Sequence, residues 1–315
     1  MSEINLFRLV DGRATKLHGH QSDLERPLQK LIEGNLETML GIRFLASEYS
    51  TGRLHAGRID TLGLDENNCP VILEYKRAAH ENVINQGLFY LNWLMDHQAD
   101  FKFLVLEKFG KDVAEAIDWS APRLVCIAAD FNRYDDHAVQ QIGRNIELIR
   151  YRKFGEELLL LEQASVYSSQ ERRSTSTKVA QPSKQDAPVV ATVAKAVGPD
   201  KSYADLVPTL SATLTELLAT IEDYIFSLGD DVQRKELRLY VAFKRLKNFA
   251  TIVLQKNRLL LYLHLNPKQC GQLPPNARDV SDIGHWGTGD LEIALANQAD
   301  FDAVKPLITM AYEGR

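Results

Sequence analysis

The first 165 residues alternate between stretches of helical and of strand periodicity. Apolar residues recur at helical spacing over residues 22–40, after a capping residue at Ser22 or Asp23. Strand-like runs follow at residues 42–49, 58–64 and 71–76. A polar turn at residues 65–68 joins the last two runs, so we expect these two strands to pair as a hairpin.

The same alternation continues toward residue 165. The predicted elements are a helix at 81–97, strands at 103–106 and 124–128, a helix at 130–143, and a strand pair at 146–152 and 157–162. The two short strands are wholly apolar, which is typical of a sheet that is covered on both faces. Residues 1–165 are therefore predicted to form an α/β domain with a mixed sheet flanked by helices.

A compositional break follows this domain. Residues 168–202 contain no Leu, Ile, Phe, Tyr or Trp. Such a segment cannot bury enough apolar surface to offset the entropy of ordering, so we predict a flexible linker over residues 166–202.

Mixed periodicity returns in residues 203–315, for which we predict a smaller α+β domain. Its predicted elements are a helix at 209–228, strands at 237–245, 249–255, 259–265 and 291–295, and a helix at 299–312 that is interrupted at Pro306.

Composition narrows the class of protein. The 315 residues include 37 Lys and Arg against 42 Asp and Glu, a net charge of −5, which excludes a strongly basic surface but not a local basic groove. Cys69, Cys126 and Cys270 are too far apart in sequence for a Cys-x-x-Cys zinc site and fit a reducing compartment. The chain has no apolar run of about 18 residues and no apolar signal region. We therefore expect a cytoplasmic protein with no membrane partner.

The candidate chemistry lies at Asp60, Glu74 and Lys76. Strand alternation places Glu74 and Lys76 on one face, with Tyr75 opposite, and the predicted hairpin brings Asp60 beside Glu74. Adjacent carboxylates repel unless positive charge lies between them, and a hard divalent cation such as Mg²⁺ is a natural occupant. Such an ion can clamp a phosphate, while Lys76 can orient a water molecule and offset charge on phosphoryl oxygens.

Polar residues around this cluster are candidates for nucleic-acid binding. Gln86 and Tyr90 share one face of the next helix, where they can overhang the carboxylates and contact a phosphate and a base or sugar. Arg58 and Arg77 flank the carboxylates and can hold phosphates. The alternative is structural, because a Glu-x-Lys pair on a strand can also form a surface salt-bridge ladder.

Asp60, the Glu74-x-Lys76 strand and the Gln86-x-x-x-Tyr90 helix resemble the PD-(D/E)XK nuclease superfamily, specifically its RecB-like branch. The segments Gly57-Arg58-Ile59-Asp60 and Val71-Ile72-Leu73-Glu74-Tyr75-Lys76-Arg77 are similar to the catalytic domain of archaeal and actinobacterial single-strand and mismatch endonucleases. The resemblance covers about residues 20–130 and implies a restriction-endonuclease-like sheet and a metal-dependent nuclease that acts on nucleic acid, with DNA as the expected substrate. The whole chain resembles an uncharacterised bacterial family with this fold and a carboxy-terminal domain of unknown function.

The resemblance also implies roles for individual residues. It implies that Mg²⁺ or Mn²⁺ is bound by Asp60, Glu74 and the backbone carbonyl of Tyr75, that Lys76 assists the attacking water, that Glu25 or Glu33 on the first helix supports the site, and that Glu48 is a further ligand. Glu25 and Glu33 are equally compatible with an ordinary exposed helix face. The residue before Asp60 is Ile59 instead of the name-giving proline. Many proteins of this fold pair to handle two strands, so a homodimer is a further expectation.

A glycine-rich loop in the carboxy-terminal domain is a second candidate site. It contains His285, Trp286, Gly287 and Gly289. Its backbone amides can cradle an anion and its two rings can stack on a base or ligand, or the loop can be a glycine turn with Trp286 in the core.

Three hypotheses therefore stand. The first is a metal-dependent nuclease whose carboxy-terminal domain recognises a substrate feature or a partner. The second is a non-cleaving nucleic-acid-binding or adaptor protein with the same fold. The third is a small-ligand sensor that acts through the glycine loop.

Overall fold

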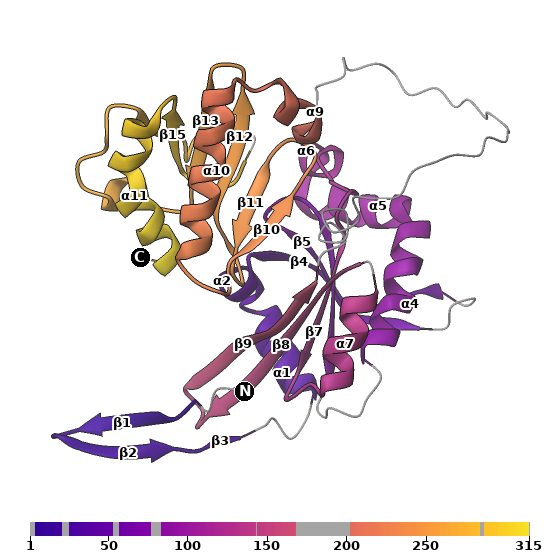
Figure 1. Ribbon diagram of the computed structural model, residues 1–315. Coiled ribbons are helices and arrows are strands. Elements are labelled where there is room, and N and C mark those ends of the chain that lie inside the picture. Colours follow the sequence, from indigo (N-terminus) through magenta and orange to yellow (C-terminus); the bar gives the residue numbers. More distant parts are fainter. Residues whose placement is uncertain are drawn as a thin grey trace, which may run out of the picture. The chain divides into compact units, whose positions relative to one another are not determined.

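The computed structural model describes most of the chain (Figure 1). The described ranges are 4–20, 25–52, 57–76, 83–142, 144–167, 202–283 and 287–314. The chain divides into two compact units, of which the first is Met1–Ser168 with Arg245–Asn248 and the second is Ser169–Lys244 with Phe249–Arg315. Except for residues 166, 167 and 202, the predicted linker lies outside the described residues.

A seven-strand mixed sheet forms the centre of the first unit (Figure 1). Its strands are β3 (Gly19–His20), β4 (Ile42–Ser50), β5 (Arg58–Asp65), β6 (Pro70–Lys76), β7 (Arg123–Ala128), β8 (Asn145–Phe154) and β9 (Leu158–Tyr167). β4, β5 and β6 form an antiparallel meander, β6, β7 and β8 run parallel, and β9 folds back antiparallel on β8. The predicted mixed sheet and the predicted β5–β6 hairpin are confirmed.

Helices flank both faces of this sheet. They are α1 (Glu25–Glu33), α2 (Leu36–Leu40), α4 (Val83–Asp96), α5 (Gln98–Phe109), α6 (Lys111–Glu115) and α7 (Arg133–Gln141). Alternation along β6 divides its side chains between two cores. Leu73 packs in the core that contains Leu28 of α1, and Ile72 packs in the core that contains Leu91 of α4. Glu74, two positions after Ile72, is therefore directed to the α4 side.

The turn between β5 and β6 is held by Asp65. One carboxylate oxygen of Asp65 accepts hydrogen bonds from the backbone amides of Asn67 and Cys69, at 2.9 and 2.8 Å. The other oxygen lies 2.9 Å from the buried guanidinium of Arg123 on β7, which also pairs with Glu147 on β8 at 2.8 Å. This buried network joins three strands of the sheet and stabilises the turn that determines the β5–β6 register.

The predicted helix at residues 22–40 is divided into α1 and α2, and two further features of the first unit differ from the sequence prediction. The strand predicted at residues 103–106 is wrong, because α5 runs through it. Within α5 the buried residues Phe101 and Val105 are four positions apart, whereas Phe103 is 57% exposed, so the apolar run is part of a helix. The second difference is an additional two-stranded sheet, formed by β1 (Leu6–Val10) and β2 (Arg13–Leu17).

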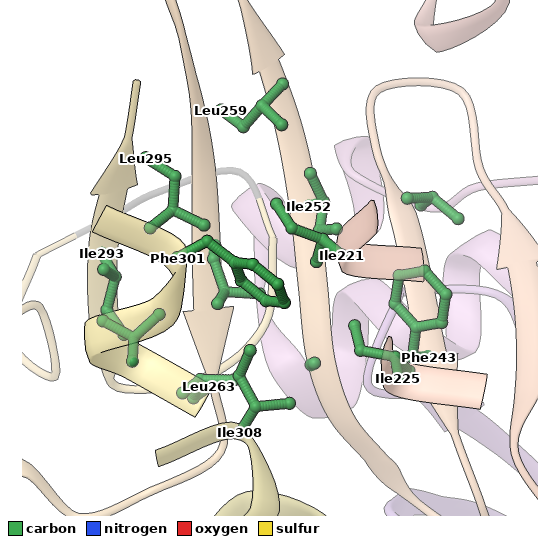
Figure 2. Close-up of a cluster of buried hydrophobic side chains, with 14 of the residues drawn as sticks. Ile221, Ile225, Phe243, Ile252, Leu259, Leu263, Ile293, Leu295, Phe301 and Ile308 are labelled. Carbon is green, nitrogen blue, oxygen red and sulfur yellow. The ribbon is translucent and has the colours of Figure 1, made fainter. Parts of the chain in front are cut away.

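The second unit has a six-strand sheet in the order β10-β11-β12-β13-β15-β14. Its strands are β10 (Gln233–Glu236), β11 (Val241–Lys244), β12 (Asn248–Gln255), β13 (Arg258–Leu263), β14 (Ala277–Asp279) and β15 (Leu291–Leu295), and its helices are α9 (Tyr203–Leu206), η1 (Val207–Thr209), α10 (Ala212–Ser227), η2 (Pro267–Gln269) and α11 (Gln298–Glu313). Ile221 and Ile225 of α10 and Phe301 of α11 pack against Ile252 and Leu263 of the sheet (Figure 2). The α+β prediction is confirmed.

The predicted interruption at Pro306 is wrong, because α11 continues through it. A proline inside a helix removes one backbone hydrogen bond and costs about 3 kcal/mol. Val304, Leu307 and Ile308 surround Pro306 and bury their side chains in the core, and each such burial contributes about 1.5–3 kcal/mol. The burial of these three side chains therefore outweighs the free-energy cost of the proline within α11. Among the described residues, no helix has both the length and the apolarity needed to cross a membrane.

Candidate active site

Asp60 on β5 and Glu74 on β6 face each other across the hairpin. The paired register of β5 and β6 ends at Thr61 and Leu73, so Asp60 and Glu74 are the next residue along each strand. The backbone amide of Asp60 donates a hydrogen bond to Glu74 Oε1 at 3.3 Å, and the backbone amide of Tyr75 donates one to Asp60 Oδ2 at 3.0 Å. These reciprocal bonds hold the two carboxylates side by side, as the alternation and the short turn predict.

The Glu74 carboxyl is in an unfavourable environment for a negative charge. Its side chain is buried, and Oε2 has no hydrogen-bond partner among the residues that the structure describes. Burial and then the nearby Asp60 carboxylate raise the pKa of Glu74 to about 9. Burial also raises the pKa of Asp60, against the hydrogen bond from the Tyr75 amide. A cation between the two carboxylates would relieve both effects.

Lys76 supplies positive charge close to this pair. Its ammonium lowers the pKa of both Asp60 and Glu74, in opposition to burial. Lys76 Nζ also lies 3.9 Å from a carboxylate oxygen of Glu25, the first residue of α1. Only 16% of the Lys76 side chain is exposed, so water screens these interactions less than it would at the surface. The cluster therefore joins residues from β5, β6 and α1.

Glu48 adds a further carboxylate from β4. The β4–β5 register places it opposite Asp60, and its charge raises the pKa of Asp60 and of Glu74. Its φ of 52° is uncommon for a residue other than glycine. Glu48 Oε2 lies 2.8 Å from Nε of Arg58. Arg58, a predicted phosphate ligand, is therefore paired with a carboxylate in this structure.

The two acidic candidates on α1 have different surroundings. Glu33 Oε1 accepts hydrogen bonds from the Thr61 hydroxyl at 2.6 Å and from Gln29 Nε2 at 3.1 Å, so it ties α1 to β5. Gln29 also donates to the backbone carbonyl of Asp60 at 2.9 Å. Gln29 is not among the predicted site residues, although it lies one helical turn after Glu25 and so shares its face. Glu25, and not Glu33, lines the cavity beside the carboxylates.

Tyr90 holds the beginning of β5 in place. Its side chain is buried, and its hydroxyl accepts hydrogen bonds from the backbone amide of Arg58 at 3.2 Å and from Gln86 Nε2 at 3.3 Å. A Cβ atom at Gly57 would lie 2.6 Å from the Tyr90 ring, so this close approach requires glycine. Gln86 and Tyr90 line the same cavity as Asp60, but the Tyr90 hydroxyl is directed at the protein backbone two residues before Asp60.

A cavity of about 1050 Å³ lies beside this cluster. Its walls include Glu25, Glu48 and Asp60 together with Arg26 and Arg58. No group of three or more His, Cys, Asp or Glu side chains in the described part of the chain is arranged to hold a metal ion. Two carboxylates and a backbone carbonyl are nevertheless a suitable set for Mg²⁺, which prefers oxygen ligands and is usually held by one or two carboxylates.

Two glycines of the predicted loop in the second unit, Gly287 and Gly289, lie within the described residues. Three predicted site residues lie outside the described residues: Arg77, His285 and Trp286. Gly287 and Gly289 have φ values of 109° and 119°. A Cβ at Gly289 would lie 2.6 Å from the Leu263 backbone, and one at Gly287 would lie 2.8 Å from the Tyr262 ring. Close packing on β13 therefore accounts for both glycines, while the roles proposed for His285 and Trp286 stay predictions.

Comparisons with known proteins give three findings. The family model "Domain of unknown function (DUF5655)" matches residues 204–314, which confirms the predicted resemblance of the carboxy-terminal part to a domain of unknown function. An uncharacterized protein of Haemophilus influenzae is 27% identical over 310 residues, 98% of this chain and 99% of that protein. A solved structure of an EndoMS–dsDNA2 complex is similar over 42% of this chain and 47% of that chain, with 19% identity and a TM-score of 0.24. A TM-score of this size does not establish a shared fold.

Proposed function

We propose that the chain is a metal-dependent nuclease that hydrolyses phosphodiester bonds in DNA at the cavity beside β5, β6 and α1. The observation that carries the proposal is the buried Asp60–Glu74 pair, with one unpartnered carboxylate oxygen among the described residues and Lys76 beside it. This combination of burial, like charge and a nearby ammonium at a cavity is typical of functional sites.

The structural alternative accounts less well for these observations. In a surface salt-bridge ladder, both partners are exposed and each pair contributes little to stability. Glu74 is instead completely buried, and Lys76, whose charge lowers the pKa of Glu74, also pairs with Glu25. Burial of a carboxyl without a full set of partners destabilises the fold, so a role in binding or catalysis explains it better than a role in stability.

In this proposal, each residue at the site has its own role in metal binding, catalysis or positioning. Asp60, Glu74 and the Tyr75 carbonyl would hold Mg²⁺ or Mn²⁺, and a bound ion supplies positive charge that polarises a phosphoryl oxygen. Lys76 orients the attacking water and offsets the charge that develops on the phosphoryl group. Hydrolysis forms a bond from the water oxygen to phosphorus and breaks the bond from phosphorus to a sugar oxygen. Tyr90 positions β5, and Gln86 positions the substrate strand.

The test is cleavage of single-stranded, duplex and branched DNA by the purified full chain with Mg²⁺ or Mn²⁺. We expect cleavage that EDTA abolishes and that falls at least about a hundredfold in Asp60→Asn and in Lys76→Met, the range found when one electrostatic group is removed from an active site. Asp60→Asn keeps an acceptor for the Tyr75 amide, so its melting temperature should show that the fold survives. Glu107→Gln, an exposed position on α5, is the matched control and should cleave normally.

Two outcomes would contradict the proposal. Equal cleavage by wild type and by both site variants would identify a contaminant as the source. Tight binding of DNA by the wild type with no turnover under any of these conditions would instead support a non-cleaving nucleic-acid-binding protein.

A further inference from the structure

A β-hairpin arm, made of β1, β2 and the turn between them, extends from the first unit (Figure 1). Every residue from 7 to 16 is exposed, including Phe7 at 53%, Leu9 at 75% and Val10 at 56%. The turn residues Asp11 and Gly12 both have positive φ, 47° and 75°, as the two-residue type I′ turn requires. The arm is therefore a well-specified hairpin whose side chains are left without a core.

An arm of this kind needs a partner. An isolated two-stranded hairpin is at best marginally stable in water. The ion pair between Arg8 and Glu157, at 3.4 Å, joins two exposed side chains and contributes little. Large apolar side chains gathered on an exposed element mark an interaction site.

The net positive charge of the arm, and the basic and apolar side chains on both of its faces, favour a grooved polyanion as its binding partner. Residues 7–16 contain three basic side chains and one acidic side chain, in a chain whose net charge is −5. One face carries Arg8, Val10 and Arg13, and the other carries Phe7, Leu9 and Lys16. A second copy of the arm would bring like charges together. A flat partner would cover one face only, whereas the two walls of a groove contact both.

The arm also begins close to the candidate active site. β9 pairs with one edge of β8 from Ile146 to Phe154, and β7 pairs with the other edge as far as Arg150. β3 pairs with Phe154 and Lys153, so it lies on the edge that β7 uses, beyond the end of β7. Lys76 is level with Arg150 in the parallel register. β3 therefore occupies the strand position next to β6, at the usual interstrand spacing of about 4.8 Å. Measured along the strand direction, it begins about 10 Å past the level of Lys76.

We propose that the arm inserts into the major groove of duplex DNA and holds the duplex at the site; the choice of partner rests on the proposed nuclease function. The major groove of B-form DNA is about 12 Å wide and 8.5 Å deep and admits a two-stranded β-ribbon. The strands of the arm are about 4.8 Å apart and about 17 Å long, so the ribbon fits. Its basic side chains reach phosphates on the groove walls, and its apolar side chains contact base edges such as thymine methyl groups.

The test measures binding by the full chain to a labelled 20-base-pair DNA duplex in EDTA, by fluorescence anisotropy between 50 and 200 mM salt. The triple variant Arg8→Gln/Arg13→Gln/Lys16→Gln should bind at least tenfold more weakly at 100 mM salt. Its plot of log K against log salt should be shallower by about 2.7, or 0.9 for each lost phosphate contact.

Two further variants and an RNA duplex separate the effects of the apolar side chains, of total charge and of groove shape on binding. Phe7→Ser/Leu9→Ser should weaken binding without changing the salt slope. The matched control, which removes three exposed charges elsewhere in the first unit, is Lys102→Gln/Lys111→Gln/Arg144→Gln and should retain most of the affinity. An RNA duplex of the same sequence should bind more weakly, and its binding should not respond to the arm variants, because the major groove of A-form RNA is too narrow for side chains to read.

Three results would overturn the inference. One is an unchanged affinity and salt slope in the triple variant. Another is an equal effect of the arm variants on the RNA and DNA duplexes. The third is conversion of a dimer to a monomer in Phe7→Ser/Leu9→Ser, by sedimentation, with DNA binding unaltered, which would identify a second copy as the partner. Because EDTA prevents cleavage, a chain that binds through its arm but never cleaves would contradict the nuclease proposal alone.

Discussion

Substitution of Glu74 by Gln tests the electrostatics of the candidate site directly. Burial and the Asp60 carboxylate raise the pKa of Glu74 from its ordinary value of 4.5 to about 9 in the folded chain. In the unfolded chain this carboxyl ionises near its ordinary pKa of 4.5. Between these two pH values the folded state holds a proton that the unfolded state has lost, so the stability of the fold falls as pH rises. The stabilisation that comes from the protonated Glu74 carboxyl is complete below pH 4.5 and is lost by about pH 9.

The size of the effect follows from the same shift in pKa. Each pH unit within this window costs the wild type about 1.4 kcal/mol of unfolding free energy. The glutamine amide in Glu74→Gln cannot titrate, so the variant lacks this dependence and keeps a side chain of the same size. For a domain of about 150–250 residues, 1 kcal/mol corresponds to about 2–4 °C in Tm. The Tm of the first unit should therefore fall by about 3–6 °C per pH unit relative to Glu74→Gln.

Calorimetric melts of the full chain in EDTA at pH 6, 7 and 8 measure this difference. Glu107→Gln serves as the control, because the same chemical change at an exposed position should leave the curve parallel to the wild type. Mg²⁺ should raise the Tm of the wild type more at pH 8 than at pH 6, since the cation competes with the proton, and should not affect Glu74→Gln. Parallel pH dependences of wild type and Glu74→Gln would refute the reasoning.

Three further substitutions have defined outcomes. Arg123→Met leaves two buried carboxylates without their shared cation and should destabilise the first unit by about 3–5 kcal/mol in urea denaturation; a loss below about 1 kcal/mol would contradict this. Gly289→Ala forces an alanine into a φ of 119° against the Leu263 backbone, so the second unit should lose about 1–3 kcal/mol while the calorimetric transition of the first is unchanged. Tyr90→Phe removes the hydrogen bond to the Arg58 amide and should cost about 1 kcal/mol. It should also slow cleavage more than it weakens DNA binding, and the opposite pattern would assign Tyr90 to substrate contact.

The pairing of Asp60 with Glu74 could be predicted from sequence because only local rules determine it. A four-residue turn sets the register of the β5–β6 hairpin, and a period of two then decides which side chains share a face. The Asp65 carboxylate, which accepts two backbone amides in this turn, is the device that holds the register. Lys76 follows from the same alternation.

Features that depend on distant packing were not predictable in this way. Whether Glu25 or Glu33 reaches the cavity depends on how α1 crosses the sheet, and Gln29 becomes relevant only once that crossing is known. The apolar run at residues 103–106 is ambiguous, because short runs of this kind occur in buried strands and in helices alike. The arm is a different case, since Asp11-Gly12 between two alternating segments is a strong local hairpin signal that does not depend on distant packing, and the sequence prediction missed it.

The position of Glu74 within its sheet argues against a purely structural role. Its neighbours on the same side, such as Ile72 and Cys126, are apolar and completely buried. An apolar side chain at position 74 would complete this core, whereas a carboxyl there either keeps its proton or bears the full cost of a buried charge. Asp60 intensifies that cost without supplying a donor from its side chain. A proton on Glu74 or a cation between the two carboxylates relieves this cost, in agreement with the metal site that we propose.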